Sequence, residues 1–262
     1  MSTLNFQQAL ELITNISDNI FIFDVWVPSI KSFIKFKEIN TEQQKNIIEF
    51  YLDPNKNEFN FTKILYSIIK ENCKASSEVI ENFTIFDYSS IAFSLRNKIS
   101  NTISVEKEET EEIFDLSEIV ENYKSSEYPK LENISYSDES IKIEVELAIP
   151  TISEEIKFNE VFYSKIVSNG EKDNTKELLT NMFLIESSKH VKSIKINDNL
   201  IDYLSINEDQ KIEIIKLLPT TFTNKVLDKM KEYKDYMYKL QVLTKNDDKK
   251  LFEVNGSLFM LN

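Results

Sequence analysis

Glycine, cysteine and histidine are scarce in this sequence, and each scarcity excludes a class of site. The 262 residues include two Gly, one Cys and one His. With only Gly170 and Gly256, the chain has no glycine-rich loop of the kind that binds phosphates in P-loop and dinucleotide-binding proteins. One cysteine, Cys73, cannot form an intrachain disulfide, which fits a reducing compartment. Cys73 and His190 are too few for a zinc site that needs several such ligands.

Long apolar segments are also lacking. The longest apolar runs, such as residues 20–28, are interrupted by charge within a few residues, so none is long enough to cross a bilayer. The N-terminal residues contain no basic region followed by an apolar run, so no export signal is predicted. We therefore expect a soluble protein that is not exported and has no membrane partner. Its 41% of hydrophobic residues are enough for a core.

Basic residues are too few to balance the acidic ones. The chain has 31 Lys and Arg against 44 Asp and Glu, a formal net charge of −13. Such a field repels phosphate backbones unless a local basic patch overrides it. The densest lysine clusters, residues 225–239 and 245–250, are interleaved with acids. Direct binding to nucleic acid is therefore not expected.

The apolar periodicity predicts an α+β fold. Spacing of three and four residues predicts helices, and alternation or β-branched and aromatic runs predict strands. In the first helix, Phe6, Leu10, Ile13 and Ile16 share one face. Helix caps are predicted at Thr41, Asp87 and Ser205. The predicted helices are residues 4–16, 41–52, 59–73, 86–99, 175–186, 206–218 and 222–240, and the predicted strands lie in residues 19–28, 32–39, 141–150, 191–203 and 240–254.

A short phrase occurs twice and suggests two similar halves. Residues 27–36 (VPSIKSFIKF) and 149–158 (IPTISEEIKF) match at a constant offset, 150 − 28 = 122. We predict two hairpin-plus-helix halves, related either by internal duplication or by chance in an Ile- and Lys-rich sequence. The predicted order is an N-terminal amphipathic helix, a first half, an acidic connector and a second half that ends in a long helix and a hairpin. The predicted boundaries are 1–18, 19–104, 105–140 and 141–262.

No set of residues predicts catalysis. His190 lies between lysines at the edge of a predicted strand, so it is interpreted as a solvent-facing or turn residue. Cys73 is interpreted as a small apolar filler and Trp26 as a half-buried structural residue. Residues 197–209 are rich in Asp and Asn but lack the spacing of a calcium-binding EF-hand. We predict no catalytic residue, no metal ligand and no cofactor, which favours a protein that works by binding or assembly.

The last long helix is the predicted partner-binding surface, together with the C-terminal hairpin. Its apolar residues recur at helical spacing and form one continuous stripe, which predicts either core packing or docking to a partner. The stripe consists of Val226, Met230, Tyr233, Met237 and Leu240.

Several phrases occur in an order that points to one family. Residues 27–39 have a Pro-Ser turn before a strand, residues 40–50 form a charged helix, and residues 61–73 form a helix ending near a cysteine. An Asp-centred phrase before a Leu-Arg pair comes next and contains Phe86, Asp87, Phe93, Leu95 and Arg96. Residues 145–151 (VELAIPT), a helix and strand at 225–243, and a closing Gly-Leu-Phe phrase at 256–259 follow. This order resembles the baseplate hub family of T-even-type contractile-tailed bacteriophages.

The resemblance covers residues 20–98, 141–158 and 205–260, and it departs from the family in places. Ile149 replaces an aromatic residue, the acidic segment diverges, and the paired mid-chain cysteines of some relatives are missing. The resemblance therefore implies no metal, and it brings no catalytic residues.

The resemblance implies a non-enzymatic tail protein. It would be a baseplate hub subunit or a hub-assembly chaperone that binds hub or tape-measure proteins. It would act in the host cytoplasm during tail assembly, with the tail baseplate of the virion as the other location. The alternative from a different class is an acidic protein-binding module or inhibitor, a DNA mimic from a mobile element. A carboxylate-metal enzyme is disfavoured because no acids recur at ligand spacing.

Overall fold

The chain divides into two compact units. The computed structural model describes residues 4–54, 58–107, 110–168, 175–246 and 248–260. Unit 1 is formed by Met1–Glu127 together with Leu240–Asn262, and unit 2 is formed by Tyr128–Lys239. Helices and small antiparallel sheets alternate along the chain, which confirms the predicted α+β class. No helix among the described residues is long and apolar enough to cross a membrane.

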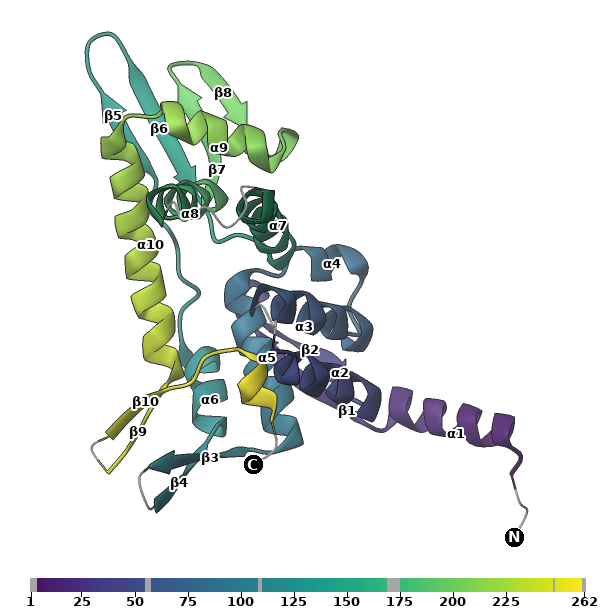
Figure 1. Cartoon of the computed structure of the whole chain (residues 1–262). Helices are drawn as coiled ribbons and strands as arrows, with labels where there is room; N and C mark the ends of the chain where they lie inside the picture. Colours follow the sequence, from purple (N-terminus) through teal and green to yellow (C-terminus); the bar gives the residue numbers. More distant parts are fainter. Residues whose placement is uncertain (1–3, 55–57, 108–109, 169–174, 247, 261–262) are drawn as a thin grey trace. The chain divides into compact units, whose positions relative to one another are not determined.

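Unit 1 contains three separate two-stranded antiparallel sheets and a set of helices (Figure 1). The sheets are the hairpins β1–β2, β3–β4 and β9–β10. A 3-10 turn, η1, joins β1 to β2, and the last turn, η3, follows β10. The elements of unit 1 are α1 (Phe6–Asn19), β1 (Ile22–Val27), η1 (Pro28–Ile30), β2 (Ser32–Lys37), α2 (Thr41–Leu52), α3 (Glu58–Asn72), α4 (Ser77–Glu81), α5 (Ile85–Ile99), β3 (Thr102–Lys107), β4 (Thr110–Asp115), α6 (Ser117–Ser125), β9 (Val242–Lys245), β10 (Asp248–Leu251) and η3 (Gly256–Phe259).

Helix α5 is the centre of unit 1. Every residue from Phe86 to Arg96 is buried, so the helix is covered on all sides by neighbouring elements. It contacts β1, η1, α3 and α6. Its N-terminus has a capping box, in which the Thr84 hydroxyl accepts from the backbone N–H of Asp87 and the Asp87 carboxylate accepts from the backbone N–H of Thr84.

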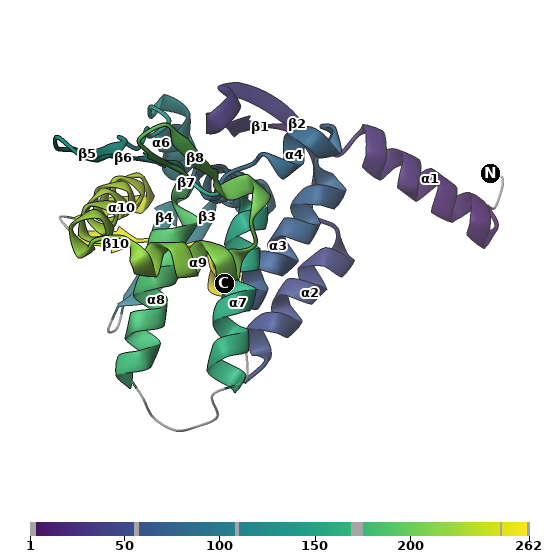
Figure 2. The same ribbon diagram turned by 90° about the horizontal axis from the view of Figure 1, so that it is seen from above.

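Unit 2 is built on one four-stranded antiparallel sheet with strand order β5-β6-β7-β8. Helices α7, α8 and α9 pack on one another, and Figure 2 shows α9 crossing over α7 and α8. The core contains apolar side chains from the sheet, from α7 to α9, and from α10. The elements are β5 (Ile134–Ser137), β6 (Lys142–Leu147), α7 (Ile152–Ser168), α8 (Thr175–Lys189), β7 (Val191–Ile196), β8 (Asn199–Asp202), η2 (Tyr203–Ser205), α9 (Glu208–Leu217) and α10 (Thr220–Gln241), whose last two residues belong to unit 1.

The predicted second hairpin is wrong. The first copy of the repeated phrase forms the hairpin β1–β2, with Lys31 in the left-handed conformation at φ 49°. In the second copy, a helix, α7, begins at Ile152. Thr151 and Glu154 cap this helix, because the Thr151 hydroxyl accepts from the Glu154 N–H at 3.1 Å and the Glu154 carboxylate accepts from the Thr151 N–H at 2.8 Å. The two phrases therefore fold differently, and the β1–β2 hairpin has no counterpart at the second phrase.

The acidic segment is not the connector that we predicted. Residues 105–140 contain most of the β3–β4 hairpin, helix α6 and strand β5. Four apolar side chains of this segment are buried, which ties its first part into unit 1: Phe114, Leu116, Ile119 and Tyr123. Their spacing is irregular because the chain changes from strand to helix between them. The boundary between the units lies after Glu127, and the C-terminal hairpin returns to unit 1 rather than completing a second half.

The three predicted helix caps lie one to three residues from the true ones. Asn40 and Asn207, rather than Thr41 and Ser205, cap α2 and α9 through capping boxes. Thr84 caps α5, and Asp87 is its third residue. In each capping box the side-chain acceptor lies three residues before the backbone N–H that it accepts from. Several polar residues near the start of each helix have this spacing, so the sequence alone does not single out the capping residue.

Candidate functional site

The predicted partner-binding stripe on α10 lies mostly in the core, which corrects that prediction. Val226 and Met230 are part of the hydrophobic cluster of unit 2, and Tyr233 is also buried. Only Met237 and Leu240 are half-exposed. The three buried side chains cannot contact a partner without opening unit 2. Val226, Met230 and Tyr233 therefore serve in core packing rather than in docking to a partner.

A different apolar stripe is open to solvent, on helix α1. Phe6, Leu10 and Ile13 are separated by four and three residues, so they lie on one face of the helix. Their exposed fractions are 78%, 44% and 63%, whereas Ile16 is half-buried. The face on which the sequence predicts apolar residues is thus confirmed, but nothing in the described part of unit 1 covers its first three members.

The C-terminal end of α1 is attached to the rest of unit 1. The Asp18 carboxylate lies 2.9 Å from the amine of Lys37 and 3.6 Å from that of Lys74. The hydrogen bond from Lys37 lowers the pKa of Asp18. Helix α1 also contacts β1. The helix is therefore held at one end, while its apolar stripe lies toward the other end.

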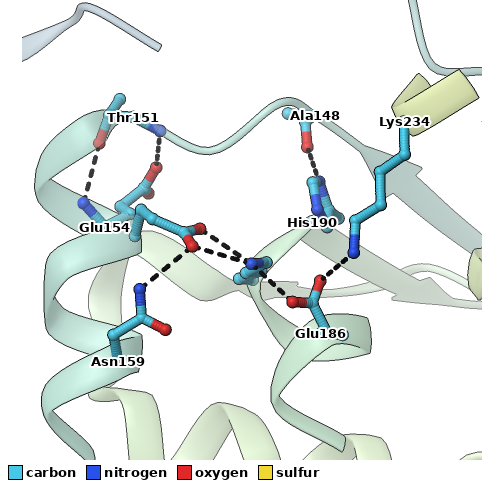
Figure 3. Close-up of polar contacts among 9 residues, drawn as sticks. Ala148, Thr151, Glu154, Asn159, Glu186, His190 and Lys234 are labelled. Carbon is cyan, nitrogen blue, oxygen red and sulfur yellow. Dashed lines mark hydrogen bonds and ion pairs between the residues drawn. The ribbon is translucent and has the colours of Figure 1, made fainter. Parts of the chain in front are cut away.

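Unit 2 contains a buried ionic cluster, centred on Lys189 at the end of α8. Figure 3 labels Glu186, Asn159 and Lys234, which belong to this cluster. The side chain of Lys189 is 7% exposed, and its amine lies 3.0 Å from both carboxylate oxygens of Glu155 on α7. The same amine lies 3.0 Å from Glu186, one turn earlier on α8. Glu186 also lies 3.5 Å from Lys234 of α10, and the Asn159 amide donates to Glu155 at 3.1 Å. The cluster thus links α7, α8 and α10.

Electrostatics within this cluster keep Lys189 and Glu186 charged. Burial lowers the pKa of Lys189, but Glu155 and Glu186 outweigh it, so the pKa lies above its ordinary value. Burial raises the pKa of Glu186, but the positive charges of Lys189 and Lys234 lower it by more. The pKa of Glu186 therefore lies below its ordinary value. Lys189 is therefore a protonated amine, which has no lone pair for nucleophilic attack or Schiff-base formation. The geometry suits a structural role, in which one cation joins two helices.

His190 is buried, so it does not face solvent, but it does lie in a turn, which is the other position that the sequence predicts for it. It is 1% exposed, and its Nδ1 lies 3.2 Å from the carbonyl oxygen of Ala148, which accepts the proton of that nitrogen. Its ring meets the ring of Tyr233 edge-on, with centroids 6.1 Å apart. Burial, together with the positive charge of Lys189, lowers the pKa of His190 to about 3. The histidine is therefore neutral in the folded protein at neutral pH.

This burial predicts a loss of stability in acid. The unfolded chain protonates His190 below its ordinary pKa of 6.5, whereas the folded protein resists until about 3. Stability from this group is therefore complete above pH 6.5 and falls as the pH drops toward 3. Between pH 8 and pH 5 the loss is about 2 kcal/mol, because one pKa unit corresponds to about 1.36 kcal/mol. Urea unfolding at both pH values measures it.

Carboxylates also titrate near pH 5, so a variant is needed to isolate the histidine. In His190→Gln the amide can still donate to Ala148, but nothing at this position titrates. We expect the difference in unfolding free energy between pH 8 and pH 5 to be about 2 kcal/mol smaller in this variant. Because His190 is the one histidine of the chain, its NMR titration can be read without assignment. Equal pH dependence in both proteins would contradict the prediction.

The other residues considered in the sequence have structural surroundings. Cys73 is buried, and burial raises the pKa of its thiol, which disfavours the reactive thiolate. Trp26 is half-buried on β1, as predicted, and its ring meets that of Phe33 edge-on with centroids 5.2 Å apart. Within the described residues, no three His, Cys, Asp or Glu side chains form a group that could hold a metal ion.

Three of the phrases on which the sequence resemblance rests meet around α5. The Asp87 carboxylate accepts from the backbone N–H of Ser29, in the Pro-Ser turn, at 2.8 Å. Arg96, on the same helix, donates from Nε to the carbonyl of Leu258, in the closing Gly-Leu-Phe phrase, at 2.6 Å. Segments far apart in the sequence are thus joined by the two charged residues of the Asp-Leu-Arg phrase. The sequence pattern includes Asp87 and Arg96, but it does not indicate which backbone groups they bind.

Comparison of the sequence with protein-family models gives no match, and neither the curated proteins nor the solved structures contain a match.

Proposed function

We propose that this chain is a non-enzymatic protein-binding component in the assembly of the baseplate hub of a contractile-tailed phage, where it binds a hub or tape-measure protein. The exposed apolar stripe of α1 is the observation that carries the binding role. The phage context rests on the order of the sequence phrases, which resembles that of the baseplate hub family. The proposed location is the host cytoplasm during assembly, or the tail baseplate if the protein stays in the virion.

The stripe on α1 is suited to docking in an apolar groove. Burying a large apolar side chain contributes about 1.5–3 kcal/mol, so three of them can supply most of the affinity of a transient complex. Helix α1 carries Glu11 and Asp18 and no Lys or Arg. Asp18 is paired within unit 1, which leaves Glu11 beside the stripe. The partner groove is therefore expected to have an apolar floor and a basic residue at its rim.

The stripe can be tested by placing charge on it. We expect the double variant Phe6→Asp with Ile13→Asp to bind its hub or tape-measure partner at least about 100-fold more weakly, because two carboxylates would have to be buried in the interface. Its unfolding free energy should change by less than about 0.5 kcal/mol, because both side chains are exposed in the folded protein. Biolayer interferometry with the purified tail proteins encoded by neighbouring genes measures the binding.

Leu52→Asp is the matched control for this experiment. Leu52 is an apolar residue of unit 1 that is 67% exposed and lies on α2 rather than α1. We expect this variant to bind like the natural protein. Equal loss of binding in the control and in the α1 variant would contradict docking through α1.

The phage context has its own tests. Genes for the tail tube, the hub and the tape measure should lie beside the gene for this chain, and a genome without them would contradict the proposal. Mass spectrometry of purified virions then separates the two forms of the role. A permanent subunit is retained in the virion, whereas a chaperone is found only in assembly intermediates.

A further inference from the structure

Unit 1 contains a groove that the proposed function does not use. Its volume is about 860 Å³. One wall is formed by β3 and the start of β4, and the other by β10 and the residues that lead into η3. Within the residues that the structure describes, both ribbons that flank the groove, β3–β4 and β9–β10, consist of two strands. Two-stranded ribbons are marginally stable alone, and a further strand stabilises them.

The pairing register shows which backbone groups of β10 point away from its partner. The N–H of Phe252 donates to the carbonyl of Gln241 at 3.1 Å, which fixes this pair as hydrogen-bonded. Hydrogen-bonded and non-hydrogen-bonded pairs alternate along an antiparallel ladder. Leu251, opposite Val242, and Lys249, opposite Thr244, are therefore non-hydrogen-bonded pairs. Their N–H and C=O groups point outward, and no other strand of the described residues pairs with β10.

The outer edge of β10 is thus open to pairing along two alternate residues. Leu251, whose backbone groups point outward, also lines the groove. An unpaired edge of this kind is a template for an added strand, and main-chain hydrogen bonds then supply affinity. The side chains that the groove presents decide which strand fits.

Those side chains are apolar below and acidic at the rim. Phe252 and Leu258 are buried against the groove, and Val105 is half-buried on the facing wall. Three carboxylates line the groove, from Glu106, Glu111 and Glu253, against one amine, that of Lys250. Side chains of a strand point alternately to its two faces. A strand that alternates apolar and basic residues would therefore place its apolar side chains against the floor of the groove and its basic side chains beside the carboxylates.

We propose that this groove binds an extended segment of a partner protein, which pairs with the outer edge of β10 and alternates apolar with basic residues. The occupant differs from a second copy of this chain, because β10 itself has Lys249 and Lys250 in succession and does not alternate apolar with basic residues. The proposal concerns a surface separate from α1. It therefore holds or fails independently of the phage role.

The probe is a synthetic peptide, acetyl-Lys-Val-Lys-Val-Thr-Val-Lys-amide, labelled with fluorescein and added to the full chain. We expect saturable binding by fluorescence anisotropy and amide shift changes by NMR centred on Lys249 and Leu251. The control peptide has the same sequence and charge, but its valine nitrogens are methylated, which removes the donors needed for strand pairing. It should bind at least about tenfold more weakly. Equal binding of both peptides would overturn the proposal.

Two protein variants separate the groove from the general negative charge of the chain. Glu253→Lys changes the rim of the groove, and Glu78→Lys makes the same charge change at an exposed residue of α4, outside the groove. We expect the first to weaken binding of the basic peptide by about tenfold and the second to leave it nearly unchanged. Equal weakening in both variants, or shift changes away from β10, would show nonspecific attraction and overturn the proposal. Dimerisation through β10, seen by analytical ultracentrifugation and lost in Leu251→Lys, would also overturn it.

Discussion

Replacing Lys189 by methionine is expected to lower the free energy of unfolding by about 3–5 kcal/mol, because removal of one partner leaves buried charges uncompensated. Two carboxylates depend on this amine. Glu155 has both oxygens 3.0 Å from it, and Glu186 lies at the same distance. In the variant, Glu186 keeps only the more distant Lys234, at 3.5 Å, and Glu155 keeps the amide of Asn159. Urea unfolding at pH 7, followed by circular dichroism, measures the loss.

A matched control and a compensating variant make this prediction specific. Lys192, three residues later on β7, is also a lysine paired with a glutamate, but its side chain is 49% exposed. Lys192→Met is expected to cost less than about 1 kcal/mol, as exposed ion pairs contribute little. Adding Glu155→Leu and Glu186→Leu to Lys189→Met should restore much of the stability, because an apolar replacement of a whole buried ion cluster is often tolerated.

Two results would contradict this account of the cluster. The first is a loss in Lys189→Met no larger than the loss in Lys192→Met. The second is a triple variant that is less stable than the single one, which would mean that packing rather than charge dominates at this position.

The sequence predicted the elements of this fold better than their burial. Periodicity located both α1 and α10, since an apolar stripe at helical spacing appears in each. It could not tell which stripe a neighbour covers, because that depends on contacts between distant segments. Val226 and Met230 meet the sheet and helices of unit 2, whereas Phe6 and Ile13 meet no described neighbour that covers them. The stripe predicted as a surface on α10 is therefore mostly core, and the exposed stripe lies on α1.

Local sequence also failed to distinguish a strand from a helix in the repeated phrase. Residues 27–36 and 149–158 have five identical residues, but Glu154 and Glu155 replace Ser32 and Phe33 in the second copy. Acidic residues in a first helical turn are favourable, whereas an aromatic residue favours a strand. These two substitutions, at the positions where β2 begins in the first copy, thus outweigh five identities, and the second copy becomes α7.

The buried polar residues were the least predictable part of the molecule. Lys189, His190 and Arg96 look like ordinary surface residues when the chain is read one segment at a time, since charged side chains are seldom fully buried. Each is buried because its partners come from other segments: Glu155 from α7 for Lys189, Ala148 for His190, and Leu258 for Arg96. A single sequence without aligned relatives carries no signal for such pairs.

Arg96→Met is expected to lower the free energy of unfolding by about 3 kcal/mol or more, and to loosen the C-terminal segment in particular. Arg96 is 1% exposed, and no carboxylate of the described residues pairs with it. Its guanidinium donates to three backbone carbonyls instead, at 2.6 Å to Leu258, at 3.0 Å to Thr102, and also to Ser100. Burial lowers the pKa of Arg96, but arginine keeps its charge in proteins. The variant loses charge-assisted hydrogen bonds, each of which contributes about 1.5–3 kcal/mol to the free energy of unfolding. Part of this loss is offset because the variant no longer buries a charge.

The position of the three acceptors makes the result specific to Arg96. Ser100 and Thr102 follow α5, whereas Leu258 belongs to η3, so the guanidinium joins the start of β3 to the C-terminal turn. Amide hydrogen exchange should therefore rise first in residues 256–260. The stability of Arg96→Lys should lie between that of the natural protein and that of the methionine variant, because one ammonium group cannot reach three separate carbonyls with the same geometry. Lys98→Met, on the same helix but 45% exposed, is the control and should cost less than about 1 kcal/mol. If Arg96→Met costs no more than that control, the C-terminal turn is held by the packing of Leu258 and Phe259 alone.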